Sequence, residues 1–178
     1  MRAQAVNMNV FVFDFDDTLV TTDAKIKVFK NKAFDRSLTP KEFSNYKLRQ
    51  GEQYDFSDFR NPNIILKAKK HKAWHIMYSI SNLIKKDQSV AVLYILTARN
   101  NEVKSTIYEF LKQNNIEIEI NNVLTIGDVD DISLAKQRVL SDLTTKYTKV
   151  FFFDDDIKNI KLAKAIHGVE ALLVENLK

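Results

Sequence analysis

Residues 10–19 read Val-Phe-Val-Phe-Asp-Phe-Asp-Asp-Thr-Leu, and the expected fold is organised around this stretch. The four apolar residues 10–13 run without a polar break and stop at Asp14. An unbroken apolar run of this length is typical of a strand that is buried on both faces of a parallel sheet. Ligands of open α/β sheets bind at the carboxyl ends of such strands, so Asp14, Asp16 and Asp17 fall where a site is expected.

Three carboxylates within four residues repel one another at the mouth of this strand. At a separation of about 4 Å, two unit charges repel by roughly 4 kcal/mol at an effective dielectric constant near 20. A buried strand that ends in this way therefore indicates a bound cation. The alternative is an Asp-rich loop that turns the chain and caps the next helix.

The composition is that of a globular protein and excludes several kinds of site. A length of 178 residues fits one domain with a small insertion, and 45% hydrophobic residues argue against disorder. No apolar run approaches the roughly 20 residues of a membrane span, and residues 1–9 hold no secretory signal, so we expect a cytoplasmic protein without membrane contact. The absence of cysteine excludes disulfides and thiolate metal sites, and three glycines are too few for a P-loop or a dinucleotide fingerprint.

The net charge of +4 is unevenly distributed along the chain. Residues 20–89 hold 15 Lys or Arg against 7 Asp or Glu, whereas the remainder holds 12 against 16. An acidic core with a basic insertion indicates an anionic substrate that is steered towards a cation-binding centre. The alternative is a solvated face that is rich in lysine.

The segment 20–60 is less regular than the rest, and we interpret it as a flap or small cap inserted after the first strand. The alternation over 25–30 predicts a half-exposed strand that pairs with residues 33–38 in a hairpin. Thr39-Pro40 predicts an N-cap and the start of a short helix. Residues 50–60 read as a loop.

The remainder of the chain alternates between helices and apolar strands. This pattern predicts an α/β fold, namely a three-layer Rossmann-like domain with a mainly parallel five-stranded sheet. We expect residues 1–178 to form this single domain. After the first strand, the predicted helices are 63–86, 101–114, 133–143 and 157–166, and the predicted strands are 90–96, 116–126 (in two pieces), 150–153 and 169–174.

Polar residues follow three of the predicted strands at what should be one edge of the sheet. Asp14 and Asp16 follow the first strand, Thr97 follows the second, and Asp154 and Asp155 follow the fourth. Taken singly, each is explained as a solvated strand end or a helix cap. Together they predict one polar site at the carboxyl edge, with a lysine, Lys136, on the helix that leads into the fourth strand.

These residues resemble the motifs of the haloacid dehalogenase-like (HAD) hydrolases. The run Asp14-Phe-Asp-Asp-Thr18 resembles their first motif, Asp-x-Asp-x-Thr. Thr97 resembles the second motif, Lys136 the third, and the adjacent pair Asp154-Asp155 the fourth. The resemblance covers roughly 9–19 and 63–174 and leaves 20–60 in the place of a variable cap. The order of the motifs is also similar to that of small phage-type and nucleic-acid-repair phosphatases in the family.

Two features depart from the family pattern. Asp17 stands before Thr18, where the family often has glycine. The lysine motif has little local signature, so Lys136 is chosen by its place before the fourth strand, and Lys146 and Lys149 are its rivals.

The resemblance implies a Mg²⁺-dependent phosphomonoester hydrolase with an aspartyl-phosphate intermediate. Asp14 would be the nucleophile, and Asp16 would protonate the leaving oxygen and later activate water. Thr97 would donate a hydrogen bond to a phosphoryl oxygen, and Lys136 would offset negative charge. An acid at position 16 favours a phosphatase over a dehalogenase, whose leaving halide needs no proton.

The same resemblance implies the magnesium ligands. Mg²⁺ prefers carboxylate oxygens and water. Asp14, Asp154 and Asp155 would supply side-chain oxygens, and Asp16 would supply its backbone carbonyl.

The expected substrate is a nucleotide or a phosphorylated nucleic-acid end. Lysines of the flap would contact backbone phosphates. Tyr46, Tyr54, Phe56 and Phe59 would either stack on bases or pack the flap onto the core, and we favour packing. The alternatives are a phosphatase of a small phosphorylated metabolite and a catalytically idle nucleic-acid-binding module of the same fold. A phospho-acceptor receiver domain is excluded, because its acceptor Asp follows the third strand. The sequence does not determine the oligomeric state.

Overall fold

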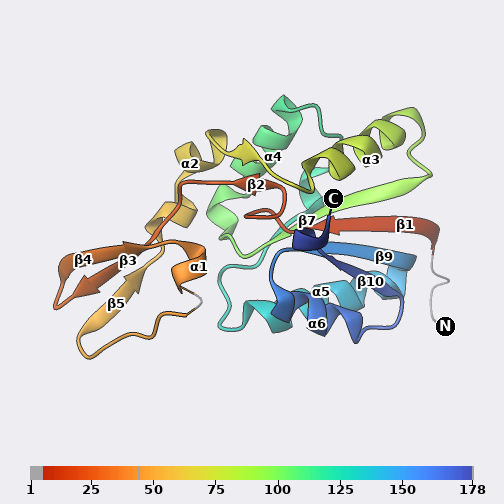
Figure 1. Cartoon of the computed structure of the whole chain (residues 1–178). Helices are drawn as coiled ribbons and strands as arrows, with labels where there is room; N and C mark the ends of the chain where they lie inside the picture. The colour runs from red at the N-terminus through yellow and green to blue at the C-terminus, as the bar shows by residue number, and fades with distance from the viewer. Residues whose placement is uncertain (1–5, 44, 178) are drawn as a thin grey trace.

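A five-stranded sheet lies at the centre of the computed structural model, which describes residues 6–43 and 45–177 (Figure 1). Every neighbouring pair of its strands is parallel. This confirms the predicted α/β class and five-stranded parallel sheet, which we call the large sheet. Its strands, in spatial order, are β10 (Val169–Leu173), β9 (Tyr147–Asp154), β1 (Val6–Phe13), β7 (Ala91–Thr97) and β8 (Val123–Thr125).

Helices cover both faces of the large sheet and complete the predicted three layers (Figure 1). One face carries α3 (Trp74–Lys86) and α4 (Lys104–Gln113), and the other carries α5 (Ile132–Lys146) and α6 (Ile157–Lys164). Phe13 packs into the core on the first face, whereas Val10 and Val12 pack into the core on the second. Because successive side chains at this end of β1 enter different cores, residues 10–13 have no polar break.

The register of the large sheet aligns the ends of its central strands. Phe13 is level with Ile95 on β7 and with Phe153 on β9, and the rings of Phe13 and Phe153 stack with their centroids 4.5 Å apart. The next residues along β1 and β9 are Asp14 and Asp154. These two side chains therefore leave the sheet side by side, on neighbouring strands at its carboxyl edge.

A second, antiparallel sheet follows β1 in the chain, and we call it the small sheet (Figure 1). Its strands are β4 (Ala33–Leu38), β3 (Ile26–Lys30) and β5 (Glu52–Asp55), in that spatial order. The hairpin prediction is confirmed, and its turn residues Asn31 and Lys32 adopt positive φ angles of 49° and 69° without glycine. The prediction that residues 50–60 form a loop is wrong in part, because β5 pairs with β3. No local sequence pattern indicates this pairing.

Helix α1 (Pro40–Phe43) confirms the start predicted at Thr39-Pro40. The Thr39 hydroxyl accepts a hydrogen bond from the Glu42 N–H at 3.2 Å, and the Glu42 carboxylate accepts one from the Thr39 N–H at 2.8 Å. These reciprocal bonds form a capping box.

The prediction of a single helix over residues 63–86 is wrong. The chain forms α2 (Pro62–Leu66), then the two-residue strand β6 (Lys69–Lys70), and only then α3. β6 pairs with β2 (Val20–Thr21), and the His71 N–H donates to the Leu19 carbonyl at 2.8 Å. This pairing with the loop that follows β1 overrides the local helical pattern.

The strand region predicted over 116–126 is reduced to β8. Ile116 and Ile118 are buried in the core beside α3 and α4, but they pair with no strand among the described residues. Among these residues, none of the helices combines the length and the apolar character of a membrane span. The short 3₁₀ helices are η1 (Ser57–Arg60), η2 (Asn101–Val103), η3 (Ile120–Asn122) and η4 (Val174–Asn176).

Candidate functional site

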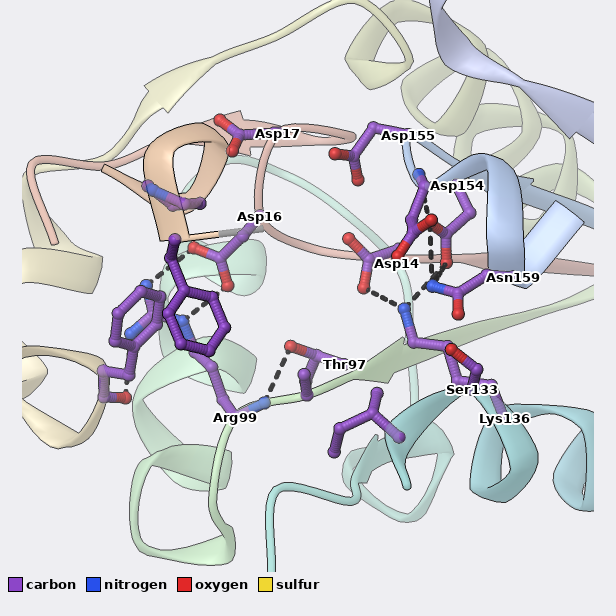
Figure 2. A pocket seen from close by; sticks show the side chains of 16 residues that line it. Asp14, Asp16, Asp17, Thr97, Arg99, Ser133, Lys136, Asp154, Asp155 and Asn159 are labelled. Atoms are coloured by element: carbon purple, nitrogen blue, oxygen red, sulfur yellow. Dashed lines mark hydrogen bonds and ion pairs between the residues drawn. The ribbon is translucent and has the colours of Figure 1, made fainter. Parts of the chain in front are cut away.

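A cavity of about 280 Å³ lies at the carboxyl edge of the large sheet (Figure 2). Its lining combines the ends of β1, β7 and β9 with residues of α1 and η1, which flank the small sheet. Every residue predicted for the site lines this cavity: Asp14, Asp16, Thr97, Lys136, Asp154 and Asp155.

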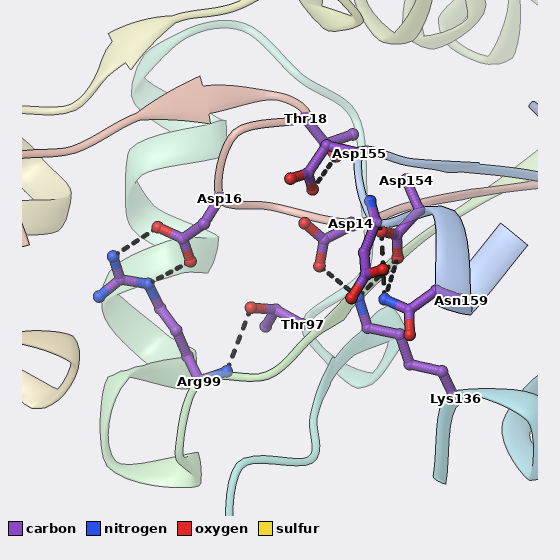
Figure 3. A network of polar contacts seen from close by, with 10 residues as sticks. Asp14, Asp16, Thr18, Thr97, Arg99, Lys136, Asp154, Asp155 and Asn159 are labelled. Atoms are coloured by element: carbon purple, nitrogen blue, oxygen red, sulfur yellow. Dashed lines mark hydrogen bonds and ion pairs between the residues drawn. The ribbon is translucent and has the colours of Figure 1, made fainter. Parts of the chain in front are cut away.

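Lys136 joins the two central strands at the floor of the cavity. Its Nζ atom donates to Asp14 Oδ1 at 2.6 Å and to Asp154 Oδ2 at 2.7 Å (Figure 3). All three side chains are buried. The rivals Lys146 and Lys149 are exposed, and Lys149 pairs with Glu170 instead. The lysine that lies in the cavity is therefore Lys136.

Asp155 completes a cluster of three carboxylates. Its Oδ1 atom accepts a hydrogen bond from the Thr18 hydroxyl at 3.2 Å. One carboxylate oxygen each from Asp14, Asp154 and Asp155 lies within 4.8 Å of the others. We call these three residues the acidic cluster. They are the residues that sequence reasoning assigned to Mg²⁺ through their side chains.

The acidic cluster carries more negative charge than Lys136 neutralises. Burial raises the pKa of Asp14 well above its ordinary value, and the charges of Asp154 and Asp155 add to this effect against the opposing charge of Lys136. Burial and the Asp154 charge raise the pKa of Asp155 to about 6. Burial lowers the pKa of Lys136, but the charges of Asp14 and Asp154 outweigh it, so this pKa is raised. Three carboxylates against one ammonium form a set of hard oxygen donors with room for a divalent cation.

Asn159 on α6 is a member of the site that sequence reasoning missed. Its Nδ2 atom donates to both carboxylate oxygens of Asp154, at 3.1 and 3.0 Å. The Asp156 N–H donates to the same carboxylate at 2.8 Å. These bonds fix the orientation of Asp154. The sequence offered one signal for Asn159. It is an amide side chain five residues after Asp154, on the helix α6 that follows β9.

The carboxylate of Asp16 does not join the acidic cluster. It accepts a bidentate pair of bonds from Arg99, with Nε to Oδ2 at 2.8 Å and Nη2 to Oδ1 at 2.7 Å (Figure 3). The Thr22 hydroxyl also donates to Asp16 Oδ1, at 3.3 Å. Asp14 and Asp16 are therefore two residues apart in sequence but bind different cations.

Arg99 is the second residue that sequence reasoning missed. Only 1% of its side chain is exposed. Besides Asp16, it donates from Nη1 to the Phe59 carbonyl at 2.9 Å, and its guanidinium lies 5.4 Å from the centroid of the Phe59 ring. Arg99 thus connects the end of β7 to η1. Its only signal in sequence was its position two residues after Thr97.

Thr97 stands at the end of β7 with its hydroxyl in the cavity lining. The hydroxyl accepts a hydrogen bond from the Arg99 N–H at 3.2 Å. Gly127 packs against the turn that follows Thr97, and its N–H donates to the Arg99 carbonyl at 3.0 Å. A Cβ atom on Gly127 would lie 2.3 Å from the Ala98 carbonyl oxygen, so this contact requires glycine.

The aromatic residues of the flap pack chiefly within the small sheet. Tyr46, Tyr54 and Phe59 contact the cluster of buried aliphatic residues there, and 40% of Phe56 is exposed. Tyr46 and Tyr54 are therefore occupied by packing, but within the small sheet and not between the flap and the core as expected.

No protein-family model matches the sequence, and no curated protein matches it. Among solved structures, the chain is similar to the HAD domain of the effector protein Lem4 from Legionella pneumophila. The sequences are 13% identical, the TM-score is 0.47, and the match covers 94% of this chain and 86% of that one.

Proposed function

We propose that this protein is a Mg²⁺-dependent phosphomonoester hydrolase of the HAD type. The observation that carries the proposal is the position of Lys136 Nζ, 2.6 Å from Asp14 and 2.7 Å from Asp154, beside three carboxylate oxygens that lie within 4.8 Å of one another. This combination presents a buried nucleophile, a fixed positive charge and a set of hard ligands in one cavity. Structural strand ends rarely tolerate such repulsion without a cation.

The acidic cluster fits a magnesium ion. Side-chain oxygens of Asp14, Asp154 and Asp155 would hold it, together with the backbone carbonyl of Asp16. When bound, the ion supplies positive charge that offsets the phosphoryl oxygens.

The reaction proceeds in two displacements. A carboxylate oxygen of Asp14 attacks phosphorus, the bond to the ester oxygen breaks, and the departing oxygen takes a proton from Asp16, which has first left Arg99 and taken up that proton from solvent. Asp16 then accepts a proton from water as that water attacks phosphorus of the aspartyl-phosphate, which releases inorganic phosphate and restores Asp14. Asp16 reaches the substrate by rotating one oxygen from Arg99 towards the cavity that it lines.

Thr97 and Lys136 stabilise charge during both displacements. The Thr97 hydroxyl donates to a phosphoryl oxygen from the end of β7. The Lys136 ammonium remains next to Asp14 and offsets the charge that accumulates when a carboxylate meets a phosphoryl group. Asn159 holds Asp154 in place throughout.

We extend the proposal to nucleotides or phosphorylated nucleic-acid ends as substrates, with the small sheet as a cap over the site. The support is the excess of Lys and Arg over residues 20–89, which includes the exposed pair Lys69 and Lys70 on β6. A phosphatase of a small metabolite is the alternative in the same enzyme class. An idle binding module is disfavoured, because Asp14, Thr97 and Lys136 all line one cavity.

Hydrolysis of p-nitrophenyl phosphate by wild type and Asp14→Asn, with and without Mg²⁺, tests the proposal. We expect turnover that requires the metal and falls on the order of 10³-fold or more in the variant, because an amide is a poor nucleophile. Asp142→Asn is the matched control, since Asp142 is exposed on α5 away from the cavity. Turnover in EDTA equal to that in Mg²⁺, or an Asp14→Asn variant as fast as wild type, contradicts the proposal.

A further inference from the structure

Part of the cavity wall is aromatic, and the proposed reaction does not use it. Phe43 of α1 and Phe59 of η1 both line the cavity together with Pro40. The two rings are half-buried. They therefore pack partly against the small sheet and leave part of their surface to the cavity that contains Asp14.

The aromatic wall is held from both sides. Phe59 is bound through its carbonyl by Arg99 at 2.9 Å, with the guanidinium 5.4 Å from the centroid of its ring. The Phe43 ring packs edge-on against Tyr54 and Phe56, with centroids 5.0 and 5.5 Å away. A surface fixed in this way loses little conformational entropy when a ligand packs on it.

The packing of the small sheet uses only part of the two rings, because Phe43 and Phe59 are half-buried where they contact it. Its buried core is aliphatic and consists of Ile26, Val28 and Leu38. Rings at the mouth of a polar site provide a flat, polarised surface that prefers other flat rings in offset or edge-on contact. The wall therefore matches a planar group rather than a flexible chain.

We propose that the alcohol released by this enzyme carries a flat ring, and that this ring packs against Phe43 and Phe59. This inference rests on the proposed function and narrows its substrate class. At about 280 Å³ the cavity is near the lower limit of ligand pockets, roughly 300 Å³, which suits a phosphoryl group with a single ring system. A phenol ester and a nucleoside phosphate share this chemistry.

Benzyl phosphate and cyclohexylmethyl phosphate test the ring preference. Both are esters of primary alcohols with similar apolar bulk, so they differ chiefly in flatness. We expect wild type to favour benzyl phosphate about five- to tenfold in kcat/KM, in line with the strength of ring–ring contacts. Phe43→Leu and Phe59→Leu should reduce this ratio to below about twofold.

Phe34→Leu is the matched control, because Phe34 belongs to the small sheet, is 59% exposed and does not line the cavity. It should keep the wild-type ratio. Should Phe59→Leu fail to fold, as judged by circular dichroism, Phe43→Leu carries the test alone. Equal kcat/KM values for the two esters in wild type, or an unchanged ratio in the folded wall variants, overturn the inference.

Binding of the corresponding phosphonates separates this inference from the proposed hydrolysis. Benzylphosphonate and cyclohexylmethylphosphonate cannot be hydrolysed at phosphorus–carbon by this chemistry, so calorimetry reports ring recognition alone. Tighter binding of benzylphosphonate without any phosphatase activity leaves the ring site standing and removes the proposed function. Equal binding of the two phosphonates, together with metal-dependent turnover, overturns the ring inference and leaves the proposed function standing.

Natural-type esters identify the source of the ring. O-phosphotyrosine is compared with O-phosphoserine, and the nucleoside 5′- and 3′-monophosphates are compared with ribose 5-phosphate. A several-fold advantage in the first pair assigns a phenol ester, and an advantage in the second assigns a nucleobase. No advantage in either pair overturns the inference.

Discussion

Two buried cations stand at the carboxyl edge of the large sheet, and they differ in how completely they are neutralised. Lys136 faces the three carboxylates of the acidic cluster, whereas Arg99 pairs with the single carboxylate of Asp16. The first group is left with excess negative charge, and burial together with the neighbouring carboxylates raises the pKa values of Asp14 and Asp155. The second group is balanced and also binds the Phe59 carbonyl.

This difference indicates that the acidic cluster and the Asp16–Arg99 pair have different roles. Excess negative charge at the acidic cluster is unfavourable until a cation arrives, which is expected of a metal-dependent reaction centre. The bidentate pair carries no such excess charge; it connects β7 to η1, and in the proposed reaction it opens when Asp16 turns to the substrate. Variants at four positions test whether the two groups are as different as their contacts indicate.

Replacement of Lys136 should have the largest effect on stability. Lys136→Met leaves the buried carboxylates without their cation, so we expect the free energy of unfolding to fall by about 3–5 kcal/mol in metal-free buffer at pH 7. Urea denaturation measures this loss. Lys146→Met, at an exposed position on the same helix, should change stability by less than about 0.5 kcal/mol. A loss below about 1 kcal/mol for Lys136→Met would show that the cluster is not strained.

Asp155→Asn should stabilise the metal-free protein in a pH-dependent way. The pKa of Asp155 is raised from 3.8 to about 6, so folding favours its protonated form. The resulting stability is complete below about pH 4 and is lost as pH rises through 6. The amide avoids this loss and can still accept the Thr18 hydrogen bond. We therefore expect the variant to gain up to about 3 kcal/mol over wild type at pH 7.5, and almost nothing at pH 4.

Denaturation in EDTA between pH 4 and 8 measures this difference. Asp142→Asn serves as the exposed control in the same series. A stability difference between wild type and Asp155→Asn that is constant with pH would contradict the assigned electrostatics.

Arg99→Lys tests whether the balanced pair is independent of the acidic cluster. A lysine cannot replace the bidentate bonds to Asp16 and the bond to Phe59 together, so we expect a loss of about 2 kcal/mol. Mg²⁺ at about ten times its Kd should still stabilise the variant by about 1.4 kcal/mol, as it does wild type. Arg138→Lys, at an exposed position, is the control. Loss of the Mg²⁺ response in Arg99→Lys would show that the two groups act as one.

Asp17 lines the same cavity and should give the smallest effect. Its φ angle is 56°, in the left-handed region, and its pKa is raised by burial and by the Asp16 charge. Asp17→Gly removes both costs, but it also increases the entropy of the unfolded chain, so we expect a gain of less than about 1 kcal/mol. Asp17→Asn removes the charge alone. Thermal unfolding of the two variants separates the contributions, and a marked loss in Asp17→Gly would reveal a structural role for this carboxylate.

The parts of the fold that could be predicted were those that depend on local runs of residues. Val10 to Phe13 must be buried on both faces, and the carboxyl ends of parallel strands meet at one edge, so the proximity of Asp14 and Asp154 followed from pattern and topology. The 25–30 and 33–38 hairpin and the Thr39 cap were equally local.

Sequence alone therefore determined the parallel sheet and the acidic edge, because strand burial and chain order are encoded in neighbouring residues. Only the tertiary structure decided which cation each carboxylate binds. Arg99 reaches Asp16 across 83 positions and Asn159 reaches Asp154 from another element, and neither pairing leaves a periodic trace. The same holds for β6, whose pairing with β2 divided a predicted helix. Contacts between distant segments depend on how the layers pack, and that packing is set by the whole chain at once.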